Sequence, residues 1–437
     1  MQPPVPSALS HSTESESMSN SGIYGTMPIR TQTALTWPSG HFAITDCQII
    51  EQIERYKVLA AGILSLVLTL GIARFAYTPL LPLMQQHAGL GISEGGWLAA
   101  INYMGYLSGA IIASLTSDLY IKDRLYRAGL IVAIITTVGM GITEQLWLWS
   151  LMRFFAGLSS AAGLLLGSGL ILNWLIRHDH RSELGIHFAG LGLGIAFCAL
   201  VVELAYLYLD WRQLWYLLTA LGVLLLIPAW LWLPPPDSTS TTRSGGTMED
   251  RPPNQQFLRL FIIAYFCAGV GYVVSATFIV AIVDNLPGMQ GKGTLTFLII
   301  GLAASPACII WDLAARRIGD INALTSAFVL QIFGILLPAI SNSPFATYLS
   351  AILFGGTFIG IVSLVLTMAG RYYPTRPAKM MGKMTVSYGV AQIAAPAVTG
   401  VIAEYSQGSY LAGLYLAAFF MVIGSLLTLR LKKYATP

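Results

Sequence analysis

Twelve long apolar stretches recur along the chain from Val58 onward, separated by short polar segments. Each is long enough to cross the ~30 Å hydrocarbon core of a bilayer as an α-helix. We place them at residues 58–84, 95–117, 126–142, 146–174, 184–208, 213–233, 257–283, 294–313, 322–340, 345–370, 381–403 and 409–430. The pattern predicts an all-α membrane protein with twelve transmembrane helices, whose even number puts both chain ends on one side.

The composition agrees with this pattern and excludes several classes of protein. Of the 437 residues, 55% are hydrophobic and 10% are charged, whereas a soluble domain carries about 25% charged residues. A fold this apolar has its surface in lipid. A net charge of +4 is too small for a nucleic-acid-binding protein. The four cysteines have neither disulfide nor metal-binding spacing, and we expect no cofactor or metal.

The positions of Lys and Arg predict the orientation, because cytoplasmic loops accumulate them. With the N-terminus inside, 20 of the 24 basic residues fall on the inner side. Arg212 and Lys292 fall in outer loops, and Arg74 and Arg153 fall within spans. We therefore expect a multi-pass protein of the plasma (inner) membrane with both termini in the cytoplasm.

The polar segments predict the division into domains. Residues 1–55 are rich in Ser, Thr and Pro without the apolar core of a secretory signal, and we expect a disordered cytoplasmic tail. Within and just beyond it, residues 43–57 could form a short amphipathic helix at the membrane surface. Residues 234–256 predict a cytoplasmic linker between two six-helix bundles, 56–233 and 257–433, followed by a short tail at 434–437.

The two halves repeat weakly. GIARFAYT (71–78) in the first span lines up with GVGYVVSAT (269–277) in the seventh, which places Tyr272 opposite Arg74. In each half the second span also ends in an aspartate that is closely followed by basic residues. These are Asp118 with Lys122, Arg124 and Arg127, and Asp312 with Arg316 and Arg317. Such repetition is how transporters place a binding site between halves.

Several short strings resemble the major facilitator superfamily, over residues 56 to 433. SLTSDLYIKDR (114–124) resembles its loop motif after the second span, with Ser114 and Leu119 departing from it, and RFFAG (153–157) resembles its span-four motif. GLGLG (190–194) lacks the proline of the drug-antiporter branch. ARFAYTPLLP (73–82) with GVGYVVSATF (269–278) resembles the YbfB/YjiJ-type branch. The resemblance implies two pseudo-symmetric six-helix bundles that work by alternating access.

Apart from charges near the cytoplasmic ends of spans, three charged residues lie within spans, where each costs about 2.5–3.5 kcal/mol or more: Arg74, Arg153 and Glu203. If Glu203 pairs with one arginine, the other is free to bind an anionic group of a substrate. Alternatively the three lock spans one, four and five together, or Glu203 carries a proton.

Polar side chains around these charges could line a binding site. They are Tyr77, Asn102, Tyr106, Tyr272, Tyr388 and Gln392. Each also suits a hydrogen bond that packs helices. Pro79 and Pro82 interrupt the first span just beyond Arg74 and free backbone groups at membrane depth.

The resemblance implies an inner gate at the cytoplasmic ends of the second spans, formed by Asp118, Arg124, Asp312, Arg316 and Arg317. Ladders of small residues predict close helix contacts, for example at Gly105 with Gly109 and at Gly190 with Gly194.

These features together predict a secondary transporter of a small solute, with proton coupling and with an organic anion as the favoured substrate. An exporter of uncharged or amphiphilic compounds, of the drug-efflux type, is the alternative. A membrane enzyme needs clustered catalytic side chains, and a sensor needs a soluble domain. The sequence predicts neither such a cluster nor such a domain. We expect a monomer whose partners are a small-molecule substrate, protons and membrane lipid, with no nucleic acid.

Overall fold

The computed structural model describes residues 39–178, 180, 184–236, 252–373, 377–406 and 409–434, and gives only the backbone for residues 39–50 and 377–379. The chain divides into two units, residues 1–50 and 51–437. The first contributes the helical residues 39–50 at the start of α1 (Ser39–Leu66). All contacts given below belong to the second unit.

The twelve predicted spans are confirmed, because twelve helical segments in the described residues are long and apolar enough to cross a membrane. In the N-terminal half, the first span consists of α1, η1 (Val67–Phe75) and α2 (Tyr77–His87), and the fourth consists of α5 (Leu146–Ala161), η2 (Ala162–Gly167) and α6 (Ser168–Arg177). The others are α3 (Ile92–Leu115), α4 (Leu119–Ile142), α7 (Leu184–Ala205) and α8 (Trp211–Leu231).

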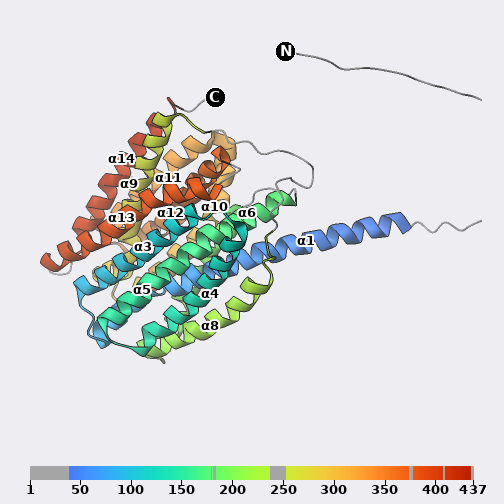
Figure 1. The fold of residues 1–437 in the computed structure, drawn as a ribbon. Coiled ribbons are helices and arrows are strands. Elements are labelled where there is room, and N and C mark those ends of the chain that lie inside the picture. Colours follow the sequence, from blue (N-terminus) through green and yellow to red (C-terminus); the bar gives the residue numbers. More distant parts are fainter. Residues whose placement is uncertain are drawn as a thin grey trace, which may run out of the picture. The chain divides into compact units, whose positions relative to one another are not determined.

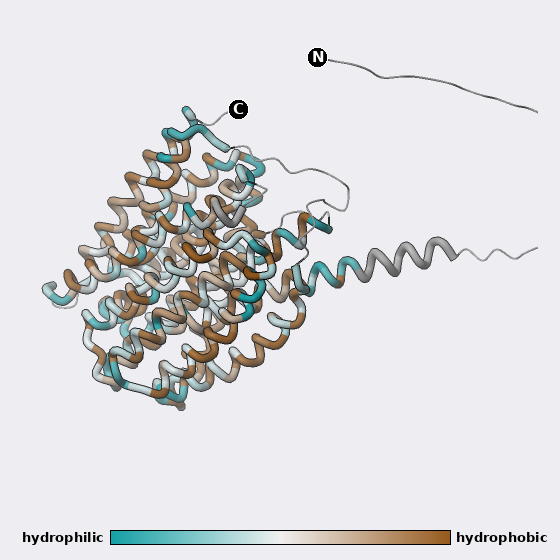
Figure 2. Tube along the Cα trace, in the orientation of Figure 1, coloured by the Kyte–Doolittle hydropathy of each residue, from teal (hydrophilic) through white to brown (hydrophobic). Residues whose placement is uncertain are grey.

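The C-terminal half contains six uninterrupted helices. They are α9 (Gln255–Asp284), α10 (Gly293–Ile318), α11 (Asp320–Ile340), α12 (Pro344–Tyr372), α13 (Pro377–Tyr405) and α14 (Leu411–Leu431). Hydrophobic residues run along the helices of both halves and hydrophilic residues gather at their ends (Figure 2). Large apolar side chains such as Leu115 and Ile142 are exposed, as expected of a surface that faces lipid.

The start of the first span differs from the prediction. Residues 39–66 form the single helix α1, so residues 39–55 are helical and 43–57 are not a separate short element. The physical reason is that residues 43–57 contain no Gly or Pro and are rich in helix-favouring Glu, Gln, Arg and Lys. Residues 1–38, most of the predicted linker and residues 435–437 lie outside the described part.

Helices pack mainly within their own half. In the N-terminal half α3 and α4 pack on α5, and in the C-terminal half α10 and α11 pack on α12 while α9 packs on α13 and α14 (Figure 1). The halves meet through α3 with α13 and through α7 with α10, with a further contact of α2 on α9.

Small residues mark the contact between the halves over its length. On α3 and α13 the close pairs are Gly382 with Ser114, Gly389 with Leu107, and Gly96 with Gly400; on α7 and α10 they are Gly185 with Cys308, Gly192 with Ser305, and Gly301 with Ala196. The pairs on α3 and α13 follow most of the length of α3, and those on α7 and α10 lie between Gly185 and Ala196 of α7.

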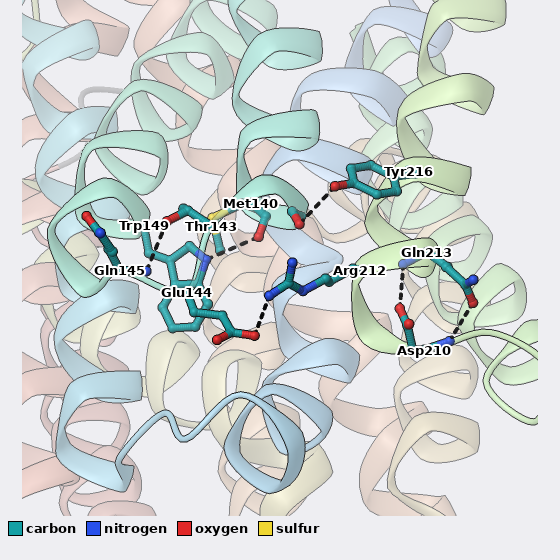
Figure 3. Close-up of polar contacts among 10 residues, drawn as sticks. Met140, Thr143, Glu144, Gln145, Trp149, Asp210, Arg212, Gln213 and Tyr216 are labelled. Atoms are coloured by element: carbon teal, nitrogen blue, oxygen red, sulfur yellow. Dashed lines mark hydrogen bonds and ion pairs between the residues drawn. The ribbon is translucent and has the colours of Figure 1, made fainter.

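At the periphery, polar contacts tie the start of α8 to the α4–α5 loop (Figure 3). Arg212 forms an ion pair with Glu144 at 2.5 Å, and the Tyr216 hydroxyl donates a hydrogen bond to the Gly141 carbonyl at 3.0 Å. Both members of the ion pair are exposed to solvent. The positive charge of this predicted outer loop therefore has a local partner and belongs to the surface.

Close approach of α3 and α5 depends on glycine, as the small-residue ladders predict. A Cβ on Gly105 would meet the backbone carbonyl of Phe154, and one on Gly157 would meet the carbonyl of Asn102. Gly163 and Gly194 similarly lie against Thr69 and Gly71 of η1. These contacts bring spans one, two, four and five together around the middle of the N-terminal half.

We expect Gly157→Ala to lower the free energy of unfolding by about 1–3 kcal/mol, because the backbone of α3 must shift to admit the methyl group. Thermal unfolding of the purified protein in detergent measures the change. Gly169→Ala is the matched control, since no atom lies within 4 Å of the added Cβ there. Equal effects of the two substitutions would contradict the role of Gly157 in packing.

Candidate functional site

The first span changes its hydrogen-bond register just before its prolines. In η1 the Ala76 N–H donates to the carbonyl of Gly71, five residues back, at 2.9 Å, as in a π-helix. In that register the Arg74 carbonyl would accept from residue 79, which is proline and has no N–H. Pro79 itself lies in the first turn of α2, where proline is tolerated. The Arg74 carbonyl is thus left for a donor from another helix.

Arg153 of α5 supplies that donor. Its Nη1 donates to the carbonyls of Arg74 at 3.2 Å and Ala73 at 3.4 Å, and its guanidinium carbon lies 4.3 Å from the ring centroid of Tyr77. The Arg153 carbonyl accepts from Asn102 Nδ2 at 2.8 Å. The side chain is 3% exposed. Arg153 therefore ties spans one, two and four together.

Arg74 projects from η1 into a group of aromatic rings. Its guanidinium carbon lies 4.5 Å from the ring centroid of Tyr103, 4.6 Å from that of Tyr106 and 5.4 Å from that of Phe75. It is 5% exposed, and its Nε has no hydrogen-bond partner in the described part of the chain. Cation–π contacts with these rings offset part of the cost of burying the charge, and the Nε–H of Arg74 stays available for a further acceptor.

Aromatic side chains of the C-terminal half face this arginine. The phenol of Tyr272 on α9 lies within electrostatic range of Arg74, as do those of Tyr103 and Tyr106. The Tyr272 ring stacks on Phe358 at 5.1 Å and on Tyr388 at 5.8 Å between centroids. Tyr388 in turn stacks on Tyr265 at 4.5 Å. A cation from one half thus meets an aromatic stack from the other.

The buried charges have no carboxylate beside them. In the part of the chain that the structure describes, Arg74 and Arg153 are buried, but no Asp or Glu is. Glu203 is half-buried in the last turn of α7, and no ion pair among the described residues joins it to either arginine. Its place at the helix end explains why it does not meet side chains in the middle of their spans.

The other predicted binding residues lie in different surroundings. Tyr106 and Tyr272 lie beside Arg74, and Tyr388 stacks on Tyr272, whereas Tyr77 and Asn102 contact Arg153. The Tyr77 hydroxyl also donates to the Gly95 carbonyl at 3.0 Å. Gln392 is buried one turn beyond Tyr388, and its Oε1 has no partner. Glu203 lies apart.

Sequence reasoning missed four aromatic residues of this site, Phe75, Tyr103, Tyr265 and Phe358. Two of them carry a signal in the spacing. Tyr265 precedes Tyr272 by seven residues, two helical turns on the same face, and Tyr103 precedes Tyr106 by three. Phe358 has no such signal, because its place beside Tyr272 depends on how α9 and α12 pack.

Each of the predicted inner-gate residues lies near the end of a helix. The Asp118 carboxylate caps α4 by accepting the Ile121 N–H at 2.9 Å, and Asp312 forms an ion pair with Arg316 of its own helix at 2.5 Å. Arg124 and Arg317 are exposed. Among the described residues no ion pair of this group joins the two halves, so an ion-paired gate stays a prediction.

Comparison with known proteins matches most of the chain to one family. Residues 66–429 match the family described as "Uncharacterised MFS-type transporter YbfB". Two curated relatives match shorter stretches. "Uncharacterized transporter mfc1" of Schizosaccharomyces pombe is 28% identical over 130 residues, 29% of this chain and 26% of that protein. "Uncharacterized MFS-type transporter YceJ" of Bacillus subtilis is 32% identical over 97 residues, 22% and 25% respectively. The chain thus matches about a quarter of each relative's length.

Solved structures match the fold over nearly the whole molecule. The nucleoside transporter NupG is 14% identical with a TM-score of 0.64, covering 87% of this chain and 100% of NupG. Its D323A mutant gives a TM-score of 0.63 over 86% and 99%. At this identity the likeness concerns the fold, and it confirms the predicted all-α architecture with twelve spans.

The two buried arginines should differ in their effect on stability. We expect Arg153→Met to lower the free energy of unfolding by about 1–3 kcal/mol, because the Arg74 carbonyl loses its donor. Arg74→Met should leave stability unchanged or higher, because it removes a buried charge that has no carboxylate. Thermal unfolding in detergent measures both. A larger loss for Arg74→Met than for Arg153→Met would assign the structural role to Arg74.

Proposed function

The chain belongs to the family of the MFS-type transporter YbfB, and on that premise we propose that it moves a small organic anion across the membrane by alternating access of its two halves. Arg74 binds the anion. Arg153 holds the backbone of η1 that carries Arg74, and Asn102 in turn holds the backbone of Arg153.

The observation that carries this proposal is the buried guanidinium of Arg74, with no buried carboxylate in the described residues to balance it. A charged side chain inside the membrane costs about 2.5–3.5 kcal/mol or more. A substrate carboxylate would offset that cost by accepting two N–H groups in a bidentate pair. A neutral substrate would leave that cost without compensation.

The position of the site supports alternating access. Arg74 comes from the N-terminal half, whereas Tyr272 and Tyr388 come from the C-terminal half, and all three are at most 5% exposed. These three residues are therefore closed off from solvent in this arrangement of the halves. Separation of the halves at one end opens the site to that side alone, as a transporter requires.

Proton coupling follows from the charge that is moved. A monoanion that crosses alone works with or against the membrane potential, at about 2.3 kcal/mol per 100 mV. Cotransport with one proton moves no net charge and lets a pH gradient drive accumulation. Glu203, half-buried in the last turn of α7, is the candidate carrier.

The aromatic stack favours a second candidate, an exporter of uncharged or amphiphilic compounds. Stacked rings bind flat neutral molecules, and NupG is described as a nucleoside transporter. Under this alternative Arg74 would hold helices together and contribute nothing to ligand charge recognition.

A panel of small carboxylates, each paired with its primary amide, separates the two candidates. We expect carboxylates to raise the melting temperature of the purified protein where their amides do not, and Arg74→Gln to weaken that binding by about 10–100-fold, as for loss of a charged hydrogen bond. Carboxylates that bind are then radiolabelled, and their uptake into proteoliposomes tests transport.

Arg212→Gln is the control, because this exposed arginine pairs at the surface (Figure 3). It should bind like the unmodified protein. Stabilisation by amides as strong as by acids, or full binding by Arg74→Gln, would overturn the anion proposal and favour the second candidate.

Asp118→Asn tests the proposed inner gate. Asparagine caps a helix as well as aspartate does, so the substitution removes the charge near Lys122 and keeps the start of α4. We expect the predicted cytoplasmic end to open. A cysteine at Ser114 should then react faster with a polar maleimide, and one at Gly400 more slowly.

Asp210→Asn is the matched control, since Asp210 caps α8 at the opposite end by accepting the Gln213 N–H at 2.8 Å. It should leave both labelling rates unchanged. Identical rates in Asp118→Asn and the unmodified protein would refute the gate.

A further inference from the structure

We infer that the substrate is an aryl monocarboxylate, a flat aromatic ring that bears one carboxylate. This inference rests on the proposed function and adds the chemical class of the anion. It follows from what each half presents at the site when the halves separate.

The N-terminal half presents one guanidinium edge. Tyr103 and Tyr106 lie at cation–π distance from Arg74, 4.5 and 4.6 Å from its guanidinium carbon. The planar geometry of a carboxylate matches two N–H donors at one edge of a guanidinium group. The Nε of Arg74 is among the buried donors that lack a partner.

The charge count limits the substrate to one carboxylate. Arg153 is the other buried cation of the described residues, and its Nη1 is engaged by the carbonyls of Ala73 and Arg74. A dicarboxylate would place its second charge among aromatic rings with no cation to receive it, at the cost of burying an unpaired charge.

The C-terminal half presents a continuous aromatic surface. Successive ring pairs are stacked within 19–27° of parallel, with centroids 4.5–5.8 Å apart. In order, the rings are Tyr265, Tyr388, Tyr272, Phe358 and Phe354. Near-parallel rings at this spacing admit a further flat ring by offset stacking. The Thr78 hydroxyl, one turn beyond Arg74, donates to the carbonyl of Ala276, one turn beyond Tyr272, at 3.2 Å, so the ring of an acid held by Arg74 falls beside this surface.

A ligand with both features contacts both halves at once. Its carboxylate is held by the N-terminal half and its ring by the C-terminal half, so it stabilises the closed arrangement more than either open one. A ligand with one feature contacts one half and lacks this effect.

Matched sets of three compounds test the inference on the purified full-length protein in detergent. The probes are benzoate, cyclohexanecarboxylate and benzamide, together with 2-naphthoate, its fully saturated acid and 2-naphthamide. We expect the aryl acids to bind about 10-fold tighter than the saturated acids, from the energy of aromatic stacking, and the amides to give no thermal shift.

Each other outcome has a separate meaning. Equal binding of aryl and saturated acids overturns the aryl class and leaves the organic anion in place. Thermal shifts with the amides but not with the acids overturn the organic-anion proposal as well. No shift by either aryl acid overturns the aryl class.

Variants locate the selectivity. Tyr272→Leu and Tyr388→Leu should reduce the ratio of aryl to saturated affinity to about 1, whereas Tyr272→Phe, which keeps the ring, should preserve it. Because the ratio is measured within one variant, a general loss of stability cancels. Tyr405→Leu is the control on the same helix as Tyr388, at a residue that is 87% exposed. An unchanged ratio in both leucine variants refutes the role of the stack.

Discussion

A guanidinium group inside a bilayer must be solvated by the protein, since neither water nor lipid tails supply acceptors there. The N-terminal half does this in two ways. Arg153 donates to the Arg74 carbonyl, which the π-register of η1 and Pro79 leave without a donor, and Arg74 lies at cation–π distance from two tyrosine rings. The glycine contacts between α3 and α5 are a condition for both, because they set the distance at which Tyr103 and Asn102 reach their partners.

The site is divided unequally between the halves. Both buried cations come from spans one and four, where the helices change register at η1 and η2. The corresponding spans of the C-terminal half, α9 and α12, are unbroken helices of 30 and 29 residues that contribute rings. The weak repeat that aligns Arg74 with Tyr272 thus places a cation on one side of the contact between the halves and an aromatic ring on the other.

Much of the fold and part of the site could be predicted from the sequence. Hydropathy gave the twelve spans, because an apolar length is a local property, and the cost of burial singled out Arg74 and Arg153. The side chains and carbonyls that these two arginines contact could not be predicted in this way. Glu203 has the right charge, but its distance from the arginines depends on where α7 ends, and the stack of Tyr272 on Phe358 depends on packing between α9 and α12. The carbonyl partner of Arg153 needs the π-register, which composition does not specify.

That register has a consequence for how span one is compared among relatives. One residue of an α-helix corresponds to about 100° of rotation and about 1.5 Å of rise. A helical wheel drawn continuously from Glu51 to His87 therefore assigns the wrong angular phase to residues on one side of η1. By the same geometry, loss or gain of one residue within Val67–Phe75 would swing Arg74 away from Tyr103 and Tyr106 with every side chain of the site retained. Insertions and deletions in these nine positions, more than substitutions, are where a family with this fold can change what its first span presents.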